Sequence, residues 1–185
     1  QLVYKNDLLN LNNYLPNFKD SIELKNHQII INFVKNKIEI SGKGKVIIED
    51  KKDDLNYKIN KKDDLYIFDT SIIVKENSLL FDAIEYEKKE DLESILRLNG
   101  KYKKGKIIEF VSILFNENKN FFLIDNLKLN DKLKILSVKQ IELNYLNKNN
   151  IQNRINLKKN KKKYEIYGKS FDVSKLINKA LNGEV

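Results

Sequence analysis

His27 is the only histidine of this 185-residue sequence, and the sequence contains no cysteine. Histidine and thiolate ligands hold most protein-bound zinc, and catalysis by histidine needs partner side chains at workable distances. No second histidine and no thiolate can share a metal with His27. We therefore interpret His27 as a surface or turn residue, and we predict no catalytic residue, no metal site and no cofactor.

Three acidic pairs, Glu49-Asp50, Asp53-Asp54 and Asp63-Asp64, have the oxygen ligands that a divalent cation prefers. Each pair is flanked by lysines, which would compete with the cation for the carboxylates. The pattern places all three pairs in turns, where clustered charges keep strand edges from pairing with other chains. We expect solvated turns rather than metal ligands.

The segment SGKGK, Ser41 to Lys45, spaces two glycines by two residues. A phosphate-binding glycine loop opens onto a helix, but here a strand-like segment follows, which argues against a phosphate site. Gly42 and Gly44 stand where a strand would place apolar side chains. Their spacing indicates a bulge, a bend or close backbone packing.

Basic charge is concentrated in the run Lys158 to Lys163, within a chain of net charge +9. Such a run can contact a nucleic-acid backbone or an anionic membrane, and it can equally be the solvated loop of a hairpin. Of the 35 basic residues only Arg97 and Arg154 are arginines. Nucleic-acid readers favour arginine, so we do not expect nucleic acid as a partner.

The elements that must position these residues are short strands. Apolar and polar residues alternate with a period of two, as in Leu55, Tyr57 and Ile59, and the pentapeptide KKDDL recurs at 51–55 and 61–65. A repeat of one strand plus one charged turn is typical of a β-meander. The sequence predicts a mainly β fold, an elongated and curved antiparallel sheet that forms a groove, trough or meander.

The two ends of the chain differ from this pattern. We expect an irregular segment or short helix over 1–20, antiparallel strands over 21–168, and a short capping helix over 170–182 with Ser170 or Asp172 as its N-cap. The sequence has no methionine and begins with Gln1. We therefore expect 1–185 to be a single β-rich segment of a longer protein. No apolar run reaches the ~20 residues of a membrane-spanning helix.

The alternating apolar positions are our candidates for a core or for the lining of a groove. They are Ile38, Ile40, Val46, Ile48, Tyr57, Ile59, Ile141, Leu143, Tyr145, Ile155, Leu157, Tyr164 and Ile166. Little helix-forming sequence is available to cover them. Either a second sheet packs on this face, or the sheet forms a trough that takes a lipid acyl chain, and the pattern alone leaves both open.

The closing stretch NIQNRINLKKNKKKYEIYGKSFDVSKLINKAL resembles a segment of the AsmA-like family of bacterial envelope proteins, the group that includes TamB and YhdP. The positions that carry the resemblance are Tyr164, Ile166, Gly168, Phe171, Asp172, Leu176 and Ile177. Upstream strands, such as NKIEISGKGKVIIED and FLIDNLKLNDKLKILSVKQIELNYLNKNN, look like earlier layers of the same family. The resemblance covers residues 20–183.

The resemblance implies a non-catalytic, periplasmic segment of a protein anchored in the inner membrane and involved in outer-membrane biogenesis. Its β-groove would carry phospholipids between the two membranes, with phospholipid acyl chains and neighbouring segments of the same chain as partners. The alternative is a structural or interaction β-domain with a closed core, such as an envelope assembly scaffold.

Overall fold

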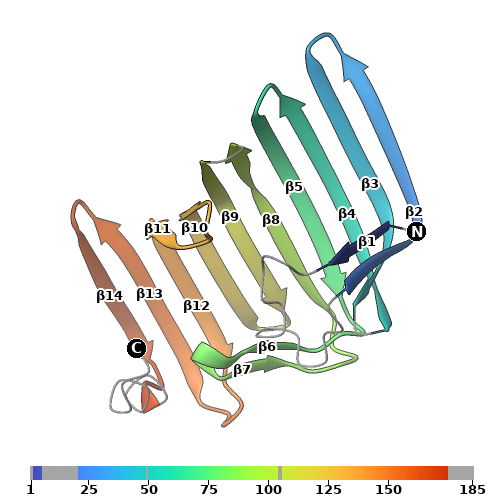
Figure 1. Cartoon of the computed structure of the whole chain (residues 1–185). Helices are drawn as coiled ribbons and strands as arrows, with labels where there is room; N and C mark the ends of the chain where they lie inside the picture. The colour runs from blue at the N-terminus through green and yellow to red at the C-terminus, as the bar shows by residue number, and fades with distance from the viewer. Residues whose placement is uncertain (1, 6–20, 49, 104–105, 175–185) are drawn as a thin grey trace.

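The alternating strands pair into one large antiparallel sheet that does not close into a barrel (Figure 1). The computed structural model describes residues 2–5, 21–48, 50–103 and 106–174. The strands of this sheet are β1 (Leu2–Lys5), β2 (Ser21–Val34), β3 (Lys37–Ile48), β4 (Lys51–Lys62), β5 (Leu65–Val74), β8 (Ser94–Lys103), β9 (Ile107–Glu117), β10 (Asn120–Asn130), β11 (Ile135–Ser137), β12 (Gln140–Leu146), β13 (Gln152–Asn160) and β14 (Lys163–Ser170).

The order of the strands in the sheet follows their order in the sequence, as in a meander. One excursion interrupts it between β5 and β8. There the chain forms a small separate hairpin, β6 (Leu79–Phe81) and β7 (Tyr86–Lys88), joined by the 3₁₀ turn η2 (Asp82–Ile84). Figure 1 shows this hairpin crossing one end of the long strands.

The register of the strands aligns apolar side chains in rows across the sheet. Directly opposed residues of antiparallel strands point to the same face. One such row runs through seven strands: Leu55, Ile72, Leu96, Phe115, Phe122, Leu143 and Ile155. The next row contains Tyr57, Thr70, Leu98, Ile113, Ile124, Ile141, Leu157 and Ile166. We call the face that carries these rows the apolar face.

The opposite face is mixed in character, and one of its rows is wholly polar. The row beside the second apolar one consists of Lys58, Asp69, Asn99, Ser112, Asp125, Gln140, Lys158 and Glu165. A period of two along each strand, combined with pairing in register, therefore gives the sheet one apolar face and one face with more polar side chains.

Two expectations about the chain ends change. Residues 2–5 are not irregular but form β1, which pairs with Ser21 to Leu24 of β2 because backbone groups at a sheet edge find partners in a further strand. Residues 6–20 lie outside the described residues. Ser170 is still part of β14, so it does not cap a helix, and the capping helix is not seen; positions 175–182 also lie outside the described residues.

Glycines mark the places where chains approach one another too closely for a side chain. A Cβ on Gly100 of β8 would collide with the backbone oxygen of Glu109, where a bulge shifts the register between β8 and β9. A Cβ on Gly42 of β3 would meet only the far end of the Tyr57 ring. A Cβ on Gly44 would lie 2.6 Å from the backbone oxygen of Asn26 and from the Cα of His27, so close backbone packing is confirmed at Gly44, whereas the close neighbour of Gly42 is a side chain.

Replacing Gly100 by alanine should destabilise the fold by about 1–3 kcal/mol, because backbone atoms of β9 cannot move away without breaking strand pairs. Gly42→Ala is the matched control, since the Tyr57 ring can turn aside. Chemical denaturation of both variants tests this difference. Equal free energies of unfolding for the two variants would contradict the close approach at Gly100.

Candidate functional site

The β6–β7 hairpin packs on the apolar face and leaves a groove of about 580 Å³ between itself and the sheet. Its walls are almost wholly aliphatic and aromatic. The lining residues are Ile22, Ile48, Ile72, Val74, Asn77, Leu79, Phe81, Asp82, Ile84, Leu96, Leu98, Ile113, Phe115, Phe122, Ile124, Ile141 and Leu143. Apolar pockets of this size are typical binding sites for small ligands.

A cluster of aromatic rings fixes the hairpin on the sheet. Tyr86 of β7 lies edge-to-face on Phe122, with ring centroids 4.7 Å apart, and Phe122 in turn lies edge-to-face on Tyr145 at 5.2 Å. Phe115 and Phe81 complete the cluster. Edge-to-face pairs of this kind add to the hydrophobic gain from burial, so the cluster is a strong attachment.

Both buried tyrosines of this cluster have hydrogen-bond partners. Tyr86 Oη donates to a carboxylate oxygen of Glu117, and Tyr145 Oη donates to the backbone oxygen of Ile84 at 3.0 Å. Burial, followed by the nearby Glu117 carboxylate, raises the pKa of Tyr86 far above its ordinary value. Burial raises the pKa of Tyr145 to about 12. Both hydroxyls therefore stay protonated and remain donors at physiological pH.

A buried polar cluster holds the chain where it leaves β5 for the hairpin. The Asp53 carboxylate accepts hydrogen bonds from the backbone N–H groups of Lys75 (2.7 Å) and Glu76 (3.0 Å), and from Asn77 Nδ2 (2.7 Å). Asp53 is only 2% exposed. These contacts satisfy two part-buried backbone donors and the buried Asn77 amide, which would otherwise lack these partners.

Lys88 completes the cluster from the other end of the hairpin. Its fully buried ammonium donates to the backbone oxygens of Lys75 at 2.7 Å and Asn77 at 2.6 Å. Burial lowers the pKa of Lys88, and the negative charge of Asp53 acts against that decrease. Asp53 and Lys88 therefore stabilise the same short loop, residues 75–77. Asp53 accepts hydrogen bonds from this loop, and Lys88 donates hydrogen bonds to it.

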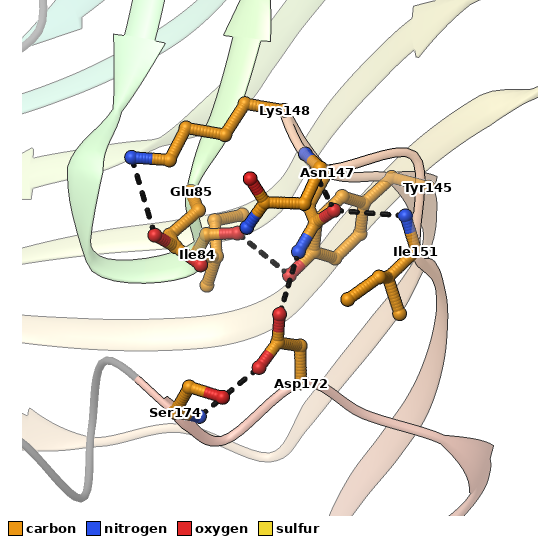
Figure 2. Close-up of polar contacts among 9 residues, drawn as sticks. Ile84, Glu85, Tyr145, Asn147, Lys148, Ile151, Asp172 and Ser174 are labelled. Atoms are coloured by element: carbon orange, nitrogen blue, oxygen red, sulfur yellow. Dashed lines mark hydrogen bonds and ion pairs between the residues drawn. The ribbon is translucent and has the colours of Figure 1, made fainter.

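The tip of the hairpin is tied to the turn between β12 and β13 (Figure 2). Lys148 donates its backbone N–H to Glu85 O at 2.9 Å, and its Nζ lies 3.2 Å from the Glu85 carboxylate. In the same turn, Asn147 Nδ2 donates to Asp172 at 3.0 Å, and Asp172 accepts the N–H of Ser174 at 3.1 Å. Hydrogen bonds from Ser174 lower the pKa of Asp172.

The register places all thirteen of the core or lining candidates on the apolar face, where their environments differ. Ile48, Ile141 and Leu143 line the groove. Val46 and Tyr145 are buried beneath the hairpin. The half-buried candidates are Ile38, Ile40, Tyr57, Ile59, Ile155 and Leu157, and the exposed ones, on β14, are Tyr164 and Ile166.

The prediction that His27 lies at the surface or in a turn was wrong, because its side chain is half-buried. His27 lies within β2 and its ring stacks on Tyr57, with centroids 5.5 Å apart and planes 15° from parallel. The reason is Gly44, whose missing side chain leaves room for the imidazole. A register shift in β2 between Lys25 and Gln28 allows this arrangement.

The prediction that every acidic pair lies in a turn was also wrong. Asp63 and Asp64 do form an exposed turn, but the first KKDDL copy lies within β4, where Asp53 is buried and Asp54 is exposed. Sequence reasoning missed Asp53 and Lys88 because their partners lie 22 or more and 11 or more residues away. The only local signal was that Asp53 occupies an apolar position of the alternation.

The described residues contain no group of three or more histidine, cysteine, aspartate or glutamate side chains that could hold a metal ion. No helix among them is long and apolar enough to cross a bilayer. What the arrangement offers chemically is an apolar surface, which binds apolar groups by removing them from water.

Comparisons with known proteins give no match: no family model fits the sequence, and neither the curated proteins nor the solved structures yield a similar chain.

Replacing Asp53 by alanine should cost about 3 kcal/mol, because it leaves the buried Asn77 amide and two part-buried backbone donors without their acceptor. Asp54→Ala is the matched control, since Asp54 is exposed and makes only a surface ion pair with Lys45; it should cost less than about 1 kcal/mol. Thermal and urea unfolding of both variants measure the difference. A stable Asp53→Ala protein would show that the hairpin is not held by this cluster.

Proposed function

We propose that this chain is a non-catalytic, lipid-binding β-segment, whose apolar face lines a path for phospholipid acyl chains. The observation that carries the proposal is the continuity of the apolar rows, which run through seven or more consecutive strands without a charged residue. An acyl chain needs a continuous apolar surface of this kind, because at any gap in that surface the chain would be in contact with water and lose the free energy of burial.

The groove beneath the hairpin supports the same proposal. Its lining is apolar apart from Asn77 and Asp82, so it offers no set of polar groups that would orient a sugar, a nucleotide or a peptide. A flexible hydrocarbon chain needs no such groups. The polar headgroup would stay outside, in water.

The two edges of the sheet support a role within a longer assembly. Among the described residues, β14 pairs with a strand on one side only, and β2 pairs with β1 only through its first few residues. Further strands of the same protein could hydrogen-bond there and extend the apolar rows in both directions. This is the arrangement that the resemblance to AsmA-like proteins implies, and with it a periplasmic location in a protein anchored to the inner membrane.

A second candidate function is a structural or interaction domain. The observation that favours it is the aromatic cluster of Tyr86, Phe115, Phe122 and Tyr145, because here protein rather than lipid covers the apolar face. In that case the face is a core, and the hairpin is its cover.

Placing a charge in the groove separates the two candidates. Leu143 lines the groove between Phe122 and Ile155, and a carboxylate there costs several kcal/mol unless it reaches water. We expect Leu143→Asp to stay folded, because an open groove admits water, and to lose bound phospholipid. Native mass spectrometry and lipid extraction of the purified proteins measure the lipid, and circular dichroism measures the fold.

Asn144→Asp is the matched control, with the same new side chain one residue further along β12 on the opposite face. It should keep its lipid. Unfolding of Leu143→Asp alone would support the closed core, and a wild-type protein that never carries lipid would refute lipid binding.

A further inference from the structure

The two long sides of the sheet, where the strands turn, carry opposite charge. On one side lie the turns β2–β3, β4–β5, β8–β9, β10–β11 and β13–β14 (Figure 1). The described residues of segments 34–37, 61–64, 103–106, 130–134 and 160–163 include eleven lysines and three aspartates. We call this the basic side. It has an excess of eight positive charges.

The opposite side contains Asp50, the hairpin excursion 75–93, and the turns 117–120 and 147–151. Together with Lys51 and Lys52, which flank Asp50, these described residues include nine acidic side chains and seven lysines, so the excess here is two negative charges. The net charge of the chain is therefore not spread evenly. This uneven distribution gives the molecule a charge asymmetry, which orients it as it approaches a charged partner.

Large apolar side chains are exposed close to the basic side. Phe33, next to the β2–β3 turn, is 77% exposed, and Ile135, beside the β10–β11 turn, is 70% exposed. Val34 and Leu136 are also exposed there. Exposed aliphatic and aromatic groups interspersed with lysines are the composition of surfaces that lie in a lipid interface, with the apolar groups inserted and the ammonium groups at the headgroups.

We propose that the basic side docks on the surface of an anionic lipid bilayer. Lysines near such a surface each contribute attraction, and the exposed apolar side chains add burial among the lipid tails. Duplex nucleic acid would match the charge, but its stacked and paired bases offer no apolar interior in which Phe33 and Ile135 could insert. The turns also lack arginine, the residue that binds phosphates bidentately. Docking does not require lipid in the groove, so this inference stands apart from the proposed function.

Co-sedimentation with vesicles tests the docking. The wild-type protein should bind vesicles of phosphatidylcholine with phosphatidylglycerol, should bind pure phosphatidylcholine vesicles much less, and should lose affinity as salt rises to about 0.15 M. Replacing Lys161, Lys162 and Lys163 together by serine should weaken binding to the anionic vesicles by about a hundredfold. Lys161 and Lys162 form the β13–β14 turn and Lys163 is the first residue of β14, and all three side chains are exposed, so their replacement should leave the unfolding midpoint unchanged.

The matched control replaces Lys52, Lys89 and Lys119 by serine, which removes the same charge near the acidic side. It should bind almost as the wild type does. Phe33→Ser should also weaken binding to vesicles, but leave any binding to duplex DNA unchanged. An equal loss in both triple variants, an unchanged Phe33→Ser protein, or binding to DNA without binding to vesicles would overturn the proposal. Leu143→Asp should bind vesicles normally, which keeps this test separate from that of the groove.

Discussion

The long strands of this sheet place their alternating apolar side chains on a single face. One short hairpin is the main cover that the described chain supplies for this face. Pairing in register adds the rows of neighbouring strands together instead of scattering them. The hairpin covers part of the face by burying Tyr86 and Phe81 against Phe115 and Phe122. The groove, the half-buried rows beside it and the open shape of the sheet all follow from this imbalance between apolar area and cover.

The hairpin stays in place because charge is buried with it. Moving Asp53 and Lys88 out of water is costly, and their hydrogen bonds to the 75–77 loop offset that cost only in one geometry. An alternative position of the loop would leave both charges unsatisfied. Aromatic packing supplies affinity for the sheet, and the polar cluster selects a single position, so the groove has a defined wall.

Much of this fold is predictable from the sequence, because a period of two needs only local information. The alternation at Ile38 and Ile40, or at Ile141 and Leu143, is enough to place those side chains on one face of an antiparallel sheet. The hairpin and its attachments were not predictable. Asp53 looks like its neighbour Asp54, and only the arrival of Lys75 to Asn77 from another strand distinguishes them. The position of His27 was not predictable either, because it depends on the register shift of β2 and on Gly44 in the next strand.

The position of the hairpin also connects the groove with the distribution of charge. The excursion 75–93 brings seven acidic residues to one side of the sheet, and the hairpin within it covers the apolar rows nearest to that side. The rows farther from it, which include Ile40 and Ile59, approach the basic side. The least covered part of the apolar face and the excess of positive charge therefore occur together. An anionic bilayer surface, which attracts lysines, would first contact the basic side. This is the part of the sheet from which an acyl chain has the shortest path to the apolar rows.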